Sequence, residues 1–266
     1  MNAIRLHPRT MIAIAITSLI GVVAFTWPLI AAPESSAIAH ANDAPWIFAV
    51  VVPLLLAVVI ASYSDGGLDA KSVALLGVLA AVITMLRPLG AGFAGLEPIW
   101  VILILGGRAL GPGFGFSLGA IALFASALFT GGVGPWLPFQ MLAAAWIGMG
   151  AGLLPKATGK AEIAMLAIYG AITAMAFGLL MNLWFWPFAG SLPPDIAFVP
   201  GAGLGENIVH WIRFSLVTSL GYDVPRAVLT VVVIVIAGRP ILGALRRVAR
   251  KANFQAQPAF EMMRTP

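Results

Sequence analysis

Long runs of apolar residues alternate along the chain with short segments that contain polar residues, glycine and proline. An α-helix needs roughly 20 mainly apolar residues to cross a bilayer. Eight stretches are predicted as spans on this basis: Met11–Ile30, Pro45–Ser62, Ser72–Leu86, Leu96–Gly107, Gly113–Phe129, Leu137–Leu154, Glu162–Phe188 and Val224–Ala237. The pattern predicts an all-α polytopic membrane protein with about eight transmembrane helices.

Two segments depart from simple spans. The stretches Ser72–Leu86 and Leu96–Gly107 are short, which favours shortened helices around a cavity, because irregular backbone at membrane depth needs protein or water beside it. Residues Glu206–Leu220 read as an amphipathic helix that ends at Gly221, before Pro225. This helix either lies in the membrane interface or covers a pocket, and the sequence leaves both open.

Composition supports the membrane assignment. Hydrophobic residues make up 61% of the 266 residues and charged residues only 9%, and the mean hydropathy is +1.00. A soluble domain carries about 25% charged residues. With only 9%, this chain has too few charged side chains to cover a surface that faces water on all sides. The same apolar content excludes a disordered chain.

The basic residues predict the orientation of the helices. Twelve of the 15 Lys and Arg residues fall on one side of the predicted spans, and only Arg87, Arg213 and Arg226 fall on the other. The positive-inside rule then predicts a multi-pass protein of the cell (plasma) membrane with both termini in the cytoplasm. The high pI is therefore a sign of topology rather than of nucleic-acid binding. The basic tail Arg246–Lys251 is expected to lie against anionic lipid headgroups.

The first apolar run also resembles a secretory signal. Arg5 and Arg9 precede it, and Ala37–Ala39 and Ala39–Ala41 look like signal-peptidase sites. The run is longer than the usual signal core, which favours a helix that is retained. Cleavage would leave the orientation of the other predicted helices unchanged.

Catalytic and cofactor motifs are missing from the sequence. There is no phosphate-binding loop, no nucleophile elbow and no cysteine, and the three His residues are far apart. The sequence therefore predicts no enzyme activity, no cofactor and no metal site. Carboxylates are scarce within the spans, so uphill transport would take its energy from a partner.

Aromatic and polar residues gather at the predicted outer side. Seven of the eight Trp residues lie there, which fits either an interfacial belt or a ligand cage; a belt normally occupies both interfaces. The candidate substrate-binding residues are Arg87, Glu97, Trp100, Trp136, Gln140, Asn182, Trp184, Asn207, His210 and Arg213.

Alternative roles remain open for several of these residues. Arg87 and Glu97 either pair with each other and fix a loop or present polar groups to a ligand. Gln140 lies one helical turn from Trp136, so both can face one cavity. His210 and Arg213 share a helix face and would contact either an anionic ligand or a headgroup phosphate.

Small residues recur at the other side of the chain. Ala70 and Ala74, and then Gly77 and Ala81, are spaced so that a second helix can approach closely, although such spacing also arises by chance in a chain rich in Ala and Gly. Gly111, Gly113, Gly115 and Gly119 are expected to allow tight packing inside the protein.

The region from Lys71 to Pro155 resembles the substrate-binding (S) component of an energy-coupling factor (ECF) vitamin transporter. The resemblance rests on Leu86–Gly90, Glu97-Pro98, Gly107–Gly113 and Gly131–Gln140, and it extends over roughly Ala70–Ala237. It implies three parts: an extension at residues 1–69 with two transmembrane helices, a six-helix substrate-binding core at residues 70–238, and a basic cytoplasmic tail at residues 239–266.

The resemblance also implies partners and a mechanism. An S component captures a vitamin from outside and associates with a membrane coupling subunit and two cytoplasmic ATPases. Ala70 and Ala74 match the motif that contacts the coupling subunit. The outline is most similar to cobalamin-type S components, while thiamine, riboflavin and biotin remain open. Two other functions stay as alternatives: a ligand-sensing membrane domain of a signalling system, and a self-sufficient transporter.

Overall fold

The computed structural model describes residues 8–30, 54–55, 57–58, 70–90 and 95–252. These residues form helices and loops, and no strand occurs among them. The elements are α1 (Pro8–Ile30), α3 (Ala70–Leu86), η1 (Arg87–Gly90), α4 (Ile99–Leu110), α5 (Pro112–Thr130), α6 (Leu137–Leu153), α7 (Gly159–Phe185), η2 (Trp186–Phe188), α8 (Leu204–Thr218) and α9 (Leu220–Ala252).

The long helices are suited to a membrane. In the described part of the chain five helices are long and apolar enough to cross a bilayer, namely α1, α3, α5, α7 and α9, and α4 and α6 are shorter apolar helices. Large apolar side chains such as Leu19, Val78 and Ile236 point outward on these helices. A helical membrane protein, as predicted, accounts for such an apolar exterior. Most of the predicted span Pro45–Ser62 lies outside the described residues.

The helices α8 and α9 differ in their bounds from the prediction. The helix α8 ends at Thr218, and α9 begins at Leu220 instead of Val224. Pro225 lies inside α9 and does not end it, because a proline in a helix removes one backbone hydrogen bond that packing can outweigh. The helix α9 then continues past Ala237, through Pro240, to Ala252.

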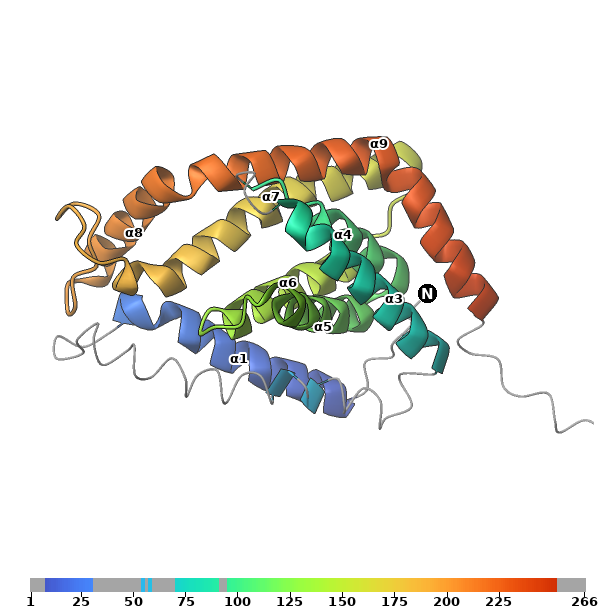
Figure 1. Ribbon diagram of the computed structural model, residues 1–266, viewed down its shortest axis with the longest axis horizontal. Helices are drawn as coiled ribbons and strands as arrows, with labels where there is room; N and C mark the ends of the chain where they lie inside the picture. Colours follow the sequence, from blue (N-terminus) through green and yellow to red (C-terminus); the bar gives the residue numbers. More distant parts are fainter. Residues whose placement is uncertain (1–7, 31–53, 56, 59–69, 91–94, 253–266) are drawn as a thin grey trace, which may run out of the picture.

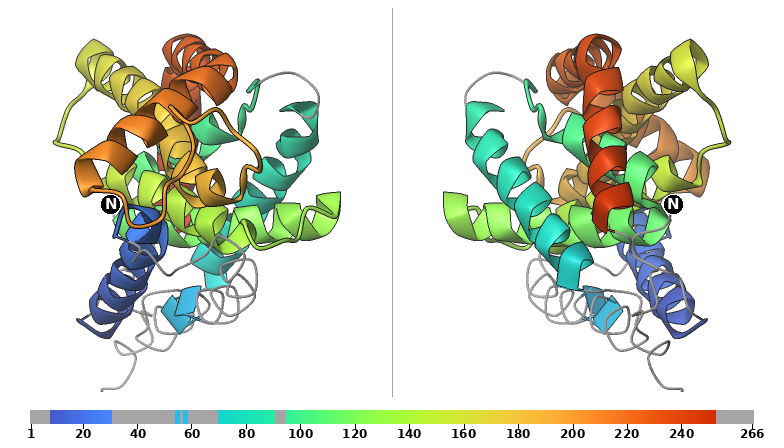
Figure 2. Two further views of the ribbon diagram at one scale, coloured as in Figure 1. Left: turned by 90° about the vertical axis from the view of Figure 1, so that its left-hand side faces the viewer. Right: turned by 90° about the vertical axis from the view of Figure 1, so that its right-hand side faces the viewer.

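The bundle has two sides joined by a central group of helices (Figure 1). The helices α7 and α9 lie side by side along one long side, and α1 lies along the opposite side. Between them, α5 packs against α3 and α6, and α4 packs against α5, α6 and α9. Figure 2 shows α3 at the flank of this group, well separated from α1.

Glycine lets the central helices approach closely. A Cβ atom added at Gly107 of α4 or at Gly115 of α5 would collide with the backbone carbonyl of Gly148 in α6. A Cβ atom at Gly119 would collide with the backbone of Ala144. The predicted internal packing at Gly115 and Gly119 is therefore confirmed.

The two ends of the bundle differ in chemistry. The end of α1, the turn that leads into α6, η2 with the loop after it, and α8 lie at one end of the bundle. We call it the aromatic end because these segments contain Trp27, Trp136, Trp186 and Trp211. The starts of α1, α3 and α7 and the last turns of α4 and α9 lie at the other end, which we call the basic end.

Candidate functional site

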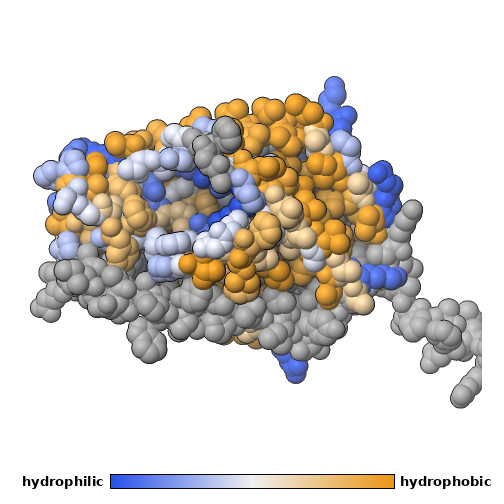
Figure 3. All heavy atoms as spheres, viewed as in Figure 1, coloured by the Kyte–Doolittle hydropathy of each residue, from blue (hydrophilic) through white to orange (hydrophobic). Residues whose placement is uncertain are grey.

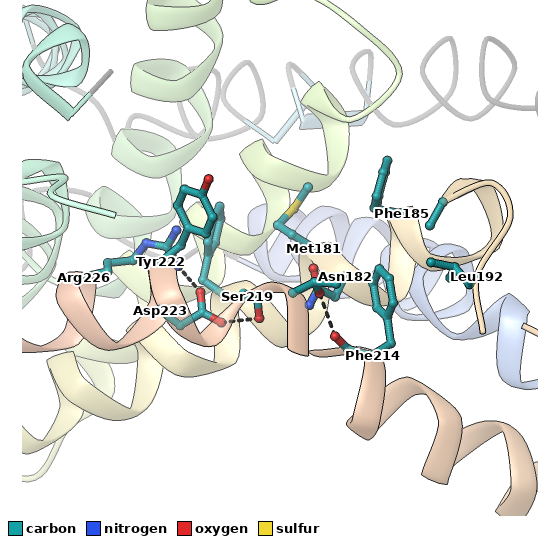
Figure 4. A pocket seen from close by; sticks show the side chains of 13 residues that line it. Met181, Asn182, Phe185, Leu192, Phe214, Ser219, Tyr222, Asp223 and Arg226 are labelled. Carbon is teal, nitrogen blue, oxygen red and sulfur yellow. Dashed lines mark hydrogen bonds and ion pairs between the residues drawn. The ribbon is translucent and has the colours of Figure 1, made fainter. Parts of the chain in front are cut away.

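A cavity of about 420 Å³ lies at the aromatic end, between α7, α8 and the first turns of α9. Its apolar wall is formed mainly by Phe177, Met181, Phe185, Leu192 and Phe214. Its polar wall is formed by Asn182, Thr218, Ser219, Tyr222, Asp223 and Arg226. Figure 4 shows the labelled side chains converging from these helices and from the loop that contains Leu192.

A buried network of charges forms one wall of the cavity. Arg226 donates from Nη1 to Asp223 Oδ1 at 2.6 Å and from Nε to Glu97 Oε2 at 3.3 Å. Asp223 is only 2% exposed and also accepts a hydrogen bond of 2.7 Å from Ser219 Oγ. An unpaired charge is costly in a buried site, so separating Arg226 from Asp223 would be unfavourable. The pairing therefore keeps these side chains in place.

Two glycines allow the network to assemble. A Cβ atom at Gly178 of α7 would fall on the carboxylate of Asp223. A Cβ atom at Gly95 would fall on the backbone carbonyl of Tyr222, and Gly95 has the positive φ of +73° that glycine tolerates best. The loop before α4 therefore lies directly against the start of α9, and this contact brings Glu97 to Arg226.

Asn182 has an unused donor in the cavity. Its Nδ2 atom is buried and has no hydrogen-bond partner within the described structure, and Figure 4 shows the side chain among those that line the cavity. A buried donor without a partner costs about 1–3 kcal/mol. A ligand carbonyl or ring nitrogen would supply the missing acceptor. Figure 3 shows that the bundle is hollowed in this region and that hydrophilic residues lie within the hollow.

The predicted residues Arg87 and Gln140 are brought together. Arg87 donates from Nη2 to Gln140 Oε1 at 2.8 Å, which joins η1 to α6. The ion pair of Glu97 within 4 Å is with Arg226, and the Glu97 charge also attracts the Arg87 guanidinium, so both roles predicted for Arg87 and Glu97 stay predictions. Arg87 Nη1 is buried and lacks a partner among the described residues.

The predicted Trp residues pack mainly against protein. Trp100 is 2% exposed, donates to Glu97 Oε2 at 2.9 Å and lies 4.5 Å from Phe177 between ring centroids. Trp184 packs against Phe139, at 5.5 Å between centroids. Trp136 is 39% exposed. None of these three belongs to the lining of the cavity.

The predicted residues of α8 have two different roles. Asn207 binds both backbone groups of Val199, donating at 3.0 Å and accepting at 3.3 Å, and His210 Nδ1 lies 2.9 Å from Ala197 O. These contacts attach the loop before α8 to the helix. Arg213 is exposed. The face of α8 that contains Asn207 also supplies Phe214 and Thr218 to the cavity, so α8 forms part of its wall.

Sequence reasoning missed the strongest part of the site. Asp223 and Arg226 were not among the candidate residues, although opposite charges three residues apart at the start of an apolar helix indicate a functional or paired site. The few carboxylates near the spans lie at helix ends. Glu97, Asp223 and Glu162 all lie within or beside apolar helices, and each is paired with arginine.

Possible metal ligands do not cluster in the part of the chain that the structure describes. No three His, Asp or Glu side chains of the described residues lie close enough together to hold a metal ion. The Ala70 and Ala74 positions are on the exposed side of α3, at the basic end and far along the chain from the cavity residues. Comparisons with protein-family models, with curated proteins and with solved structures find no match for this chain.

Proposed function

We propose that this protein captures a small organic molecule in the membrane and passes it to a partner, as the substrate-binding component of an ECF-type importer does. The observation that carries the proposal is the Asn182 amide, which is buried without a partner in a cavity with aromatic walls. Folding has left this donor unsatisfied, and ligand binding would satisfy it.

The cavity favours binding over catalysis. Ligand pockets commonly measure about 300–1,000 Å³ and combine apolar walls with a few polar groups, and this cavity of about 420 Å³ fits that description. Ser219 Oγ donates to Asp223 Oδ2 at 2.7 Å, but the other oxygen of this carboxylate is engaged by Arg226 and no His among the described residues lines the cavity. The size favours a small vitamin such as thiamine or biotin over the much larger cobalamin.

The exposed face of α3 supports delivery to a partner. Ala70, Ala74 and Gly77 are exposed on one side of this helix, and a Cβ atom at Gly77 would meet nothing within 4 Å. Small residues allow another helix to approach closely in lipid. The proposed partners are a membrane coupling subunit and two cytoplasmic ATPases, and the proposed location is the plasma membrane with both termini in the cytoplasm.

The first test is affinity purification in mild detergent, followed by mass spectrometry of proteins and small molecules that copurify. A coupling subunit, ATPases and a bound vitamin are the expected result. Recovery of a kinase or cyclase instead would favour the sensing alternative. A bound ligand that is transported by the protein alone in liposomes would favour the self-sufficient transporter.

A variant of Asn182 tests the cavity itself. Asn182→Leu removes the unsatisfied amide, so we expect equal or higher thermal stability together with affinity for the copurified ligand reduced about tenfold, the effect of losing one hydrogen bond of about 1.4 kcal/mol. Arg213→Gln is the control, because Arg213 is exposed and does not line the cavity. Unchanged affinity in Asn182→Leu would exclude this cavity as the binding site.

A further inference from the structure

A second cavity, of about 530 Å³, lies at the basic end of the bundle. It is bordered by the last turn of α4, the segment from Leu154 to Thr158, the start of α7 and the last part of α9. At its wall, Glu162 is 3% exposed and accepts hydrogen bonds from two arginines. Arg108 Nε donates at 2.7 Å, and Arg246 donates from its two terminal nitrogens at 3.0 and 2.6 Å.

The charges around this cavity do not balance. Arg108, Lys156, Arg246 and Arg250 line it, and Glu162 is the one carboxylate among the lining residues. Three positive charges are therefore left without a counter-charge in the lining. Lys156 and Arg250 are exposed and form no hydrogen bond or ion pair with other described residues. These two side chains remain available to an anion.

Arg108 and Arg246 are held by contacts within the protein, whereas Lys156 and Arg250 are exposed. Arg108 is held by Glu162 and also donates to Leu154 O at 2.9 Å, which fixes the segment after α6. Arg246 is held in a two-point contact with the same carboxylate. Because Glu162 is already shared by two guanidinium groups, it cannot neutralise Lys156 or Arg250 as well.

Two helix starts add to the positive potential. Gly111, which precedes α5, and Thr158, which precedes α7, both border the cavity, and neither start has a side-chain cap. The backbone N–H groups at a helix start carry partial positive charge and favour anions. The helix starts therefore strengthen the field produced by the four basic side chains.

We propose that this cavity binds a phosphate group, carried either by the headgroup of an anionic lipid or by a soluble phosphate compound. Arginine and lysine together with backbone N–H groups are the usual ligands of phosphate. The apolar residues Ala109, Leu154 and Ala249 complete the lining. The cavity lies where apolar helices end, which is the depth at which headgroups meet basic pockets.

The test uses native mass spectrometry of the full-length protein in detergent, titrated with dioleoyl phosphatidic acid, with phosphatidylcholine or with inorganic phosphate. The variant is Lys156→Gln/Arg250→Gln. The control is Lys160→Gln/Arg247→Gln, which removes the same charge from exposed positions outside the lining. We expect the variant to raise the Kd for phosphatidic acid about tenfold or more and the control to change it less than about twofold.

The probes separate the two sources of phosphate. Binding of inorganic phosphate that competes with phosphatidic acid supports a soluble ligand, and binding of phosphatidic acid alone supports a lipid headgroup. Equal binding of phosphatidylcholine and phosphatidic acid would overturn the proposal. So would an equal loss of phosphatidic acid binding in the variant and the control, because that would reflect general charge rather than this cavity.

Discussion

Arg226 lies between two carboxylates, and its position explains much of the chemistry at the aromatic end. It pairs with Asp223 at 2.6 Å and with Glu97 at 3.3 Å, and its side chain is 9% exposed. Asp223 is 2% exposed and depends on this guanidinium for its counter-charge. If the guanidinium were removed, the partner carboxylates would be left with uncompensated negative charge in a largely apolar environment.

This arrangement predicts unequal effects of single and double replacements. We expect Arg226→Gln to lower the free energy of unfolding by about 3–5 kcal/mol, the usual cost of breaking a buried pair. Asp223→Asn/Arg226→Gln removes both members and should cost less than the single change. Thermal unfolding in detergent measures both. Additive losses in a double-mutant cycle would show that the pair does not interact.

At the residue scale, sequence reasoning found several polar groups of the site but not their partners. Arg87 and Gln140 were placed in one region, and the structure joins them. The pairing of Glu97 with Arg226 spans 129 positions in sequence. It depends on how the loop at Gly95 packs against α9, and nothing local to either residue predicts that contact.

At the scale of elements, close packing of α7 and α9 depends on Gly178. A Cβ atom there would fall on the Asp223 carboxylate, whereas a Cβ atom at Gly221 of α9 would meet nothing within 4 Å. Both glycines lie within helices. The same substitution should therefore have opposite effects at the two positions.

We expect Gly221→Ala to stabilise the protein by about 0.5–1 kcal/mol, because alanine has the lower conformational entropy cost in a helix. Gly178→Ala should destabilise it by about 1–3 kcal/mol, the usual cost of overpacking. Comparison of the two melting temperatures in one detergent measures the difference. A stabilised Gly178→Ala protein would contradict the described contact between α7 and α9.

Helix existence was easier to predict than helix ends. The apolar runs identified α1, α3, α4, α5, α6 and α7 within a few residues, because burial and lipid exposure both require apolar side chains. The predicted bounds Val224–Ala237 are wrong at both ends, because α9 includes Pro225 near its start and runs on through the basic residues after Ala237. Within this basic part of α9, Arg246 pairs with Glu162 of α7.

At the scale of the whole molecule, the absence of cysteine from the sequence makes orientation simple to measure. Single cysteines can be introduced at Gly203, beside α8, and at Lys160, at the start of α7, which are both exposed. We expect a membrane-impermeant maleimide added to intact cells to label Gly203→Cys. Lys160→Cys should be labelled only after permeabilisation. The reverse pattern would invert the proposed topology.

A second whole-molecule prediction concerns assembly. Gly77→Leu adds bulk to the exposed face of α3 without a clash in this chain, so we expect normal folding and ligand binding but loss of the copurifying coupling subunit. Ile172→Phe enlarges an exposed side chain on α7 and serves as the control. Copurification that survives Gly77→Leu would exclude this face of α3 as the docking surface.

The sequence predicted the gathering of polar and aromatic residues toward one end, and the structure has several of them there. It did not predict that a cavity would form between α7, α8 and α9, because this requires the packing angles of three helices. The docking and transport roles rest on the resemblance and remain predictions.

Charged contacts link α4 to α9 near both ends of α4. Near its first turn, Glu97 and Trp100 connect to Arg226, and in its last turn Arg108 is linked through Glu162 to Arg246. Its 12 residues make a rod about 18 Å long. The helix α4 therefore connects the charged residues beside one cavity to those beside the other. A displacement of α9 at either cavity would strain the charged contacts through which α9 reaches α4 at that cavity.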